Sequence, residues 1–171
     1  MICLAFLRDF FNNASKVISG YELDPDVLYN RLVELAAEVP AGAEGVAFDP
    51  LFTGSRSNPL ANAAIREITP GTFTPGHMAR SLFEAMASHL ADSYREAAKL
   101  GAGERSILVG SGNAVKLNPV LRDSLEAEFG MPLQLGNNNE EAAIGAALCA
   151  AVADGAFASI AKASASFSSG N

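Results

Sequence analysis

The stretch ILVGSGNAVK at residues 107–116 predicts a short apolar strand that runs through two glycines into a helix. A strand, a glycine turn and a helix N-terminus together build a surface that backbone atoms can press against a nucleotide. The Gly110-x-Gly112 spacing lacks the third glycine and the downstream acidic residue of a dinucleotide fingerprint, and no Gly-Lys-Ser/Thr follows to make a Walker loop. On spacing alone, an ordinary strand-to-helix turn is favoured over nucleotide contact.

The segments around this turn predict a strand-helix-strand unit. An apolar strand is expected at 106–109, a helix at 116–129 and, after Gly130, a third strand at 132–135. One side of the predicted helix carries Leu117, Leu121, Leu125 and Phe129. This order implies parallel neighbouring strands joined by a right-handed crossover.

Helical periodicity and turn residues organise the N-terminal half. Residues 2–13 predict a helix that ends in a loop marked by Asn12-Asn13 and Ser19-Gly20. A second helix is expected to begin at Pro25, capped by Asp24, and to close at Pro40-Ala41-Gly42. Its predicted buried face consists of Leu28, Leu32, Leu35 and Val39.

Two short strands and the longest helix follow. The strands are predicted at 45–48 and 65–68, and the helix at 75–99, with Thr74 as its cap. A last helix at 140–153 consists almost entirely of small and apolar residues. Because a mid-helix glycine costs about 1 kcal/mol relative to alanine, Gly145 predicts close packing of this helix on a neighbour.

Composition bounds the class of protein. The 171 residues, 49% hydrophobic and 18% charged, fit one folded domain and exclude a disordered chain. A net charge of −7 with a pI near 4.8 argues against nucleic acid as a partner. Cys3 and Cys149 predict reduced core residues and a cytoplasmic location, and the longest apolar run, 142–153, is too short to span a bilayer.

The charged side chains have structural interpretations. Asp49 before a proline favours turn chemistry over contact with a metal-bound water, and a loop arginine such as Arg56 favours carbonyl or carboxylate partners over a phosphate or a sugar. A helix N-terminus explains negative charge without catalysis. The residues interpreted as structural on such grounds are Asp24, His77, His89 (placed on the inner face of its helix), Glu140 and Glu141.

Six segments match one family in order along residues 1–160. They are Phe-Leu-Arg-Asp at 6–9, Pro-Ala-Gly-Ala-Glu-Gly at 40–45, Asp-Pro-Leu-Phe-Thr-Gly-Ser-Arg at 49–56, the helix at 73–87, Val-Gly-Ser-Gly-Asn at 109–113, and Glu-Glu-Ala-Ala-Ile-Gly-Ala-Ala at 140–147. In this order they resemble the C-terminal part of FGGY-type carbohydrate kinases, most closely the sedoheptulokinase-like branch. Each motif is common, whereas the ordered set is specific.

The resemblance implies an α/β fold, the actin/hexokinase-like (ribonuclease H-like) domain, with a mixed sheet of few strands flanked by helices. Residues 1–160 are then the C-terminal domain, truncated at its start, and 161–171 a flexible tail. The glycine turn becomes the adenosine-binding element. Its carried-over residues are Gly110, Ser111, Gly112 and Asn113, with Lys116 beside them.

The resemblance also implies what this chain lacks. In the family the catalytic aspartate, the sugar-binding residues and the phosphate loops lie outside the matching part, so no catalytic or metal-binding residue is assigned here. Asn62-Ala63-Ala64 and Glu67 depart from the family pattern, in which glycine is common, and predict a differently shaped loop at 53–68.

The expected function is the nucleotide-binding C-terminal domain of a kinase that uses ATP with Mg²⁺. Such a kinase transfers the γ-phosphate to a sugar hydroxyl, as of a ketose such as sedoheptulose. The domain alone is not expected to be catalytic, and sugar binding is expected only together with the missing first domain. A stand-alone non-catalytic module that binds nucleotide or assembles with a partner remains the alternative. Neither nucleic acid nor membrane is expected, while an exposed apolar surface leaves a homodimer open.

Overall fold

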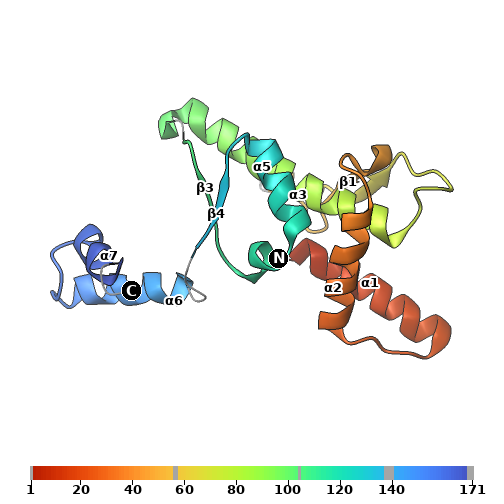
Figure 1. The fold of residues 1–171 in the computed structure, drawn as a ribbon, viewed down its shortest axis with the longest axis horizontal. Helices are drawn as coiled ribbons and strands as arrows, with labels where there is room; N and C mark the ends of the chain where they lie inside the picture. Colours follow the sequence, from red (N-terminus) through yellow and green to blue (C-terminus); the bar gives the residue numbers. More distant parts are fainter. Residues whose placement is uncertain (1, 56–57, 104, 137–140, 169–171) are drawn as a thin grey trace.

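The computed structural model describes residues 2–55, 58–103, 105–136 and 141–168 (Figure 1). Long helices dominate, and every strand is three residues long. The elements in chain order are α1 (Ile2–Ser19), α2 (Pro25–Glu38), the 3-10 helix η1 (Ala43–Gly45), β1 (Ala47–Asp49), β2 (Ala64–Arg66), α3 (Pro75–Ala97), the π-helical turn η2 (Ala98–Ala102), β3 (Leu108–Gly110), α4 (Asn113–Lys116), α5 (Pro119–Phe129), β4 (Leu133–Leu135), α6 (Glu141–Ala153) and α7 (Ile160–Ser168).

Helix α3 is the centre of the core, with α2 and α5 packed against it. Leu82 and Phe83 of α3 are completely buried, in the same core cluster as Leu32 of α2 and Leu121 of α5. Both expected caps form: Asp24 Oδ1 accepts the backbone N–H groups of two α2 residues, and Thr74 Oγ1 accepts that of His77. The predicted helices at the centre of the chain are thus confirmed, with α1 packed along α2.

The strands form two small, separate sheets flanked by helices, in agreement with the expected α/β class of few strands. Strands β1 and β2 are antiparallel, whereas β3 and β4 are parallel, with Val109 opposite Gln134. The parallel pair confirms the predicted strand-helix-strand unit. Helices α3 and α5 lie between the two strand pairs and separate them (Figure 1).

Two predicted helix boundaries are wrong for local reasons. Helix α1 continues through Asn12 and Asn13 to Ser19, and the Asn12 amide oxygen accepts the backbone N–H of Leu23 at 2.9 Å instead of ending the helix. The helix predicted at 116–129 corresponds to α5, which begins only at Pro119, and the separate short helix α4 precedes it. The break between the two helices lies at Asn118, whose Oδ1 caps α5 by accepting the Leu121 N–H at 3.0 Å.

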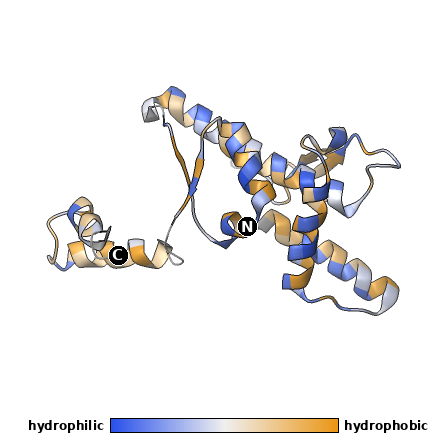
Figure 2. Ribbon diagram, in the orientation of Figure 1, coloured by the Kyte–Doolittle hydropathy of each residue, from blue (hydrophilic) through white to orange (hydrophobic). Residues whose placement is uncertain are grey.

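The C-terminal helices differ most from expectation. Helices α6 and α7 pack on each other away from α1–α5, and Figure 2 shows that α6 is largely apolar. A Cβ added to Gly145 would meet no atom within 4 Å, so the predicted close packing of that glycine is wrong among the described residues. Cys149 on α6 and His89 on α3 are exposed, although both were predicted to face inward.

The segment predicted as a flexible tail carries regular structure over most of its length, since helix α7 extends to Ser168. Within the described part of the chain, none of the helices combines the length and apolarity needed to cross a membrane.

Candidate functional site

The glycine turn forms as predicted, and the structure gives its first glycine a packing role. Gly110 ends β3 and is buried. A Cβ at this position would lie 2.8 Å from Val115 Cγ1 and 3.1 Å from Leu133 Cδ2. Glycine is therefore required where α4 and β4 close onto the end of β3.

The second glycine has a conformational role. Gly112 adopts φ 81° and ψ 156° as the N-cap of α4, a backbone region that glycine enters without steric cost. Its carbonyl oxygen accepts the N–H groups of Val115 at 3.2 Å and Lys116 at 3.1 Å. Ser111 between the glycines is exposed. Helix α4, which is one helical turn long, thus begins directly after the carboxyl end of strand β3.

A cavity of about 340 Å³ lies beside α4. This volume falls within the range of roughly 300–1,000 Å³ that small-molecule sites occupy. Its walls come from three helices: Asn113 and Ala114 of α4 with the adjoining Leu117, Leu4, Ala5 and Arg8 of α1, and Asp26 and Tyr29 of α2. Of the five predicted site residues, Asn113 lines the cavity, whereas Gly110, Ser111, Gly112 and Lys116 build the turn and the helix behind it.

The lining combines apolar surface with a few hydrogen-bonding groups. Leu4, Ala5 and Ala114 offer flat aliphatic contact, while the Asn113 amide and the Asp26 carboxylate offer donors and acceptors. Such a lining suits a flat, uncharged heteroaromatic group with polar edges.

Two buried polar groups lie behind this wall. Among the described residues, neither the Tyr29 hydroxyl nor Asn118 Nδ2 completes a hydrogen bond, and Asn118 is only 1% exposed. Burial raises the pKa of the Tyr29 hydroxyl, and the neighbouring Asn118 side chain opposes part of this rise.

The α1 and α2 residues of the cavity were missed by sequence reasoning. They lie between 81 and 106 positions before Gly110, and no local periodicity links them to it. One signal was present, since the Phe-Leu-Arg-Asp motif at 6–9 had already been matched and includes Arg8. Arg8 donates two hydrogen bonds to its neighbour, Asp9 Oδ1, at 2.7 and 2.9 Å.

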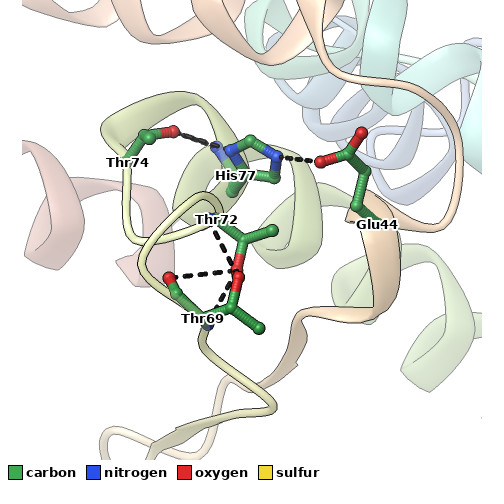
Figure 3. A network of polar contacts seen from close by, with 5 residues as sticks. All are labelled: Glu44, Thr69, Thr72, Thr74 and His77. Carbon is green, nitrogen blue, oxygen red and sulfur yellow. Dashed lines mark hydrogen bonds and ion pairs between the residues drawn. The ribbon is translucent and has the colours of Figure 1, made fainter.

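The other titratable candidates have structural partners. Figure 3 shows His77 between Thr74 and Glu44, with Nδ1 2.7 Å from the threonine Oγ1 and Nε2 3.1 Å from the Glu44 carboxylate. In the same view Thr69 and Thr72 close their own turn through a 3.0 Å hydroxyl contact. The histidine thus fastens the start of α3 to η1, which supports its structural interpretation.

Asp49 pairs with Arg66 across β1 and β2, at 3.1 Å from Nη2 to Oδ2. Arg56 and Glu140 lie outside the described residues. Glu67 adopts φ 59°, the left-handed region that glycine prefers, so the backbone shape expected of a glycine is kept at this position by a strained glutamate.

Comparisons with known proteins place this geometry in context. A model of the C-terminal domain of the FGGY family of carbohydrate kinases matches residues 3–153. Human sedoheptulokinase is 27% identical over 129 residues, which cover 75% of this chain and 26% of that protein. The chain thus spans about a quarter of the length of the curated relatives it matches.

Solved structures resemble the fold over most of the chain. A xylulose kinase from Rhodospirillum rubrum superposes with a TM-score of 0.62 at 25% identity, covering 78% of this chain and 25% of that one. A glycerol kinase from Plasmodium falciparum, solved with ADP, gives a TM-score of 0.61 at 20% identity, covering 77% of this chain and 26% of that one. The second likeness concerns the fold alone.

Proposed function

Because this chain belongs to the FGGY family of carbohydrate kinases and matches its C-terminal domain, we propose that it binds the adenosine part of ATP in the cavity beside α4. The complete kinase transfers the γ-phosphate of ATP to a sugar hydroxyl, and a ketose such as sedoheptulose is the proposed acceptor, as the named activity of the curated relatives suggests. Alone, this domain holds nucleotide without turning over sugar.

The observation that carries the proposal is the position of the cavity. It lies against the helix that the glycine turn launches, and its lining is apolar with polar edges, as a purine base requires. A glycerol kinase solved with ADP shares this fold.

The predicted residues take different parts in this proposal. Asn113 donates and accepts hydrogen bonds at the polar edge of the base, with Ala114 against its face. Gly110, Ser111 and Gly112 set the direction of α4, and Lys116 ends that helix. Residues 1–160 are proposed as the kinase domain, with α7 appended.

Magnesium is proposed for the complete kinase only. Among the described residues, no three His, Cys, Asp or Glu side chains gather closely enough to hold a metal ion. The ion would therefore be held by the ATP phosphates and by residues outside this set. Both cysteines are free, which fits the reducing cytoplasm as the compartment.

Calorimetric titration with ATP and ADP tests the proposal. We expect saturable binding with a Kd below about 1 mM, the upper range of common KM values. Asn113→Ala should raise Kd about tenfold by removing one hydrogen-bonding group. Asn13→Ala, an exposed asparagine of α1 away from this cavity, is the matched control and should leave Kd unchanged. Absence of nucleotide binding, or equal effects of the two substitutions, would overturn the proposal.

An assembly module is the second candidate function, and the exposed apolar surface of α6 favours it. Its proposed partner is a second copy of this chain, associating through α6 to remove apolar area from water. Sedimentation velocity should then show a dimer that Ala146→Glu dissociates. A monomer at every concentration tested excludes this candidate.

A further inference from the structure

Helix α4 is too short to be stable by itself. It comprises four residues, and isolated helices below about 12–15 residues are marginal in water. Three backbone hydrogen bonds close its single turn at the two ends: Gly112 O accepts from Val115 N and Lys116 N, and Asn113 O accepts from Leu117 N at 2.9 Å. Tertiary contacts must therefore hold the wall that carries Asn113 and Ala114.

The side chain of Arg122 supplies such a contact. From α5, its Nη1 donates to the carbonyl oxygens of Val115 at 3.0 Å and Lys116 at 2.7 Å. These carbonyls belong to the C-terminal end of α4, where intrahelical partners are missing and the helix dipole favours a cation. Both bonds have a charged donor, and the side chain is half-buried, so screening by solvent is reduced.

The position of Arg122 is itself fixed. Asn118 caps the start of α5 with its side chain 1% exposed, and the flanking Leu121 is buried in the core. The guanidinium therefore extends from a helix that is anchored in the core to a helix that is too short to be stable alone. Helix α5 thus stabilises α4.

We propose that Arg122 is the positioning residue of the candidate nucleotide site: without touching the cavity, it holds α4 in the conformation that presents Asn113 and Ala114 to the ligand. This inference rests on the proposed function for its ligand. When the clamp is removed, α4 occupies its ordered state for only part of the time, and Kd rises by the inverse of that fraction.

Arg122→Met tests the inference in the full chain, because it keeps the aliphatic stem and removes the donors. Hydrogen exchange in peptides covering 112–117 should accelerate in the variant without nucleotide, while exchange in α3 stays unchanged. The Kd for ATP should rise about fivefold to tenfold. Arg122→Lys, which places one charged donor near the same carbonyls, should restore most of the affinity.

Arg95→Met is the matched control. Arg95 Nη2 donates to the carbonyl oxygen of Glu128 at 3.0 Å, the same type of contact at the end of α5, and neither residue lines the cavity. This control should leave both the exchange at 112–117 and the Kd unchanged. If Arg122→Met does not fold, Arg122→Gln and Arg95→Gln replace the pair, with the same expected contrast.

The outcomes separate this inference from the proposed function. Unchanged exchange at 112–117, or an unchanged Kd despite faster exchange, overturns the positioning role of Arg122. Failure of the wild-type chain to bind ATP overturns the proposed function and with it the ligand of this site. The exchange measurement then still decides whether Arg122 orders α4.

Discussion

Gly110→Ala is predicted to destabilise the chain by roughly 1–2 kcal/mol. The new methyl group would lie 2.8 Å from Val115 Cγ1, and 3.1 and 3.5 Å from the two methyl carbons of Leu133. Overpacking of this kind costs about 1–3 kcal/mol. Part of this cost is offset because alanine lowers the conformational entropy of the unfolded chain. This effect stabilises a protein by about 0.4–1 kcal/mol where the native backbone suits both residues.

The main clash is with a stiff side chain. Valine has one strongly preferred rotamer in a helix, so Val115 cannot turn away without moving α4, whereas Leu133 can adjust. The cost of Gly110→Ala should therefore fall below about 0.5 kcal/mol in a Val115→Ala background, as a double-mutant cycle would measure.

Urea unfolding followed by circular dichroism measures these differences, and Tm should fall by about 2–8 °C in the single variant. Gly112→Ala is the matched control. It meets no atom within 4 Å but requires φ 81°, so it should cost about 1 kcal/mol that Val115→Ala does not relieve. If Gly110→Ala lowers the free energy of unfolding as much in the Val115→Ala background as in the wild-type chain, the packing explanation is refuted.

Two further predictions concern single side chains. Because burial raises the pKa of Tyr29 above 10.0, its contribution to stability is present below pH 10 and is lost as the pH rises through the folded-state pKa. Absorbance titration should show one late-ionising tyrosine that disappears in Tyr29→Phe, and an unaltered titration would contradict this assignment. Glu67→Gly should raise the free energy of unfolding by about 0.5 kcal/mol, since relief of the strain at φ 59° exceeds the added entropy of the unfolded chain. A loss of stability on urea unfolding would show that Glu67 is not strained.

Local sequence signals predicted the elements around the site but not the site itself. The β3 strand, its glycine turn and the parallel β4 were predictable because each is encoded within a few residues. The break at Asn118 was also locally encoded, by a capping asparagine before a proline, but the leucine repeat outweighed that signal. The repeat places Leu117 on a buried face, whereas this side chain is 62% exposed and lies outside both helices.

The cavity and the exposure of α6 depend on relations that periodicity cannot show. Leu4 and Asp26 meet Asn113 only because α1 and α2 pack beside α3 and α5, which is a property of the whole core. Helix α6 is apolar on all sides, a pattern typical of a buried helix, and yet its main contacts among the described residues are with α7. The composition of α6 thus predicts that another surface covers this helix. Only the three-dimensional arrangement shows whether that surface belongs to the same chain.

Different residues of the glycine turn meet different requirements: close packing, backbone conformation and ligand contact. Gly110 is required by the approach of Val115 and Leu133, and Gly112 by its backbone conformation, so neither glycine depends on a ligand for its explanation. The ligand-facing groups are Asn113 and Ala114 on a helix one turn long. Substitution of the glycines should therefore lower stability first and affinity as a consequence, whereas substitution of Asn113 should lower affinity alone. Arg122 belongs between these two classes, because it acts on the order of α4 without contributing to the cavity surface.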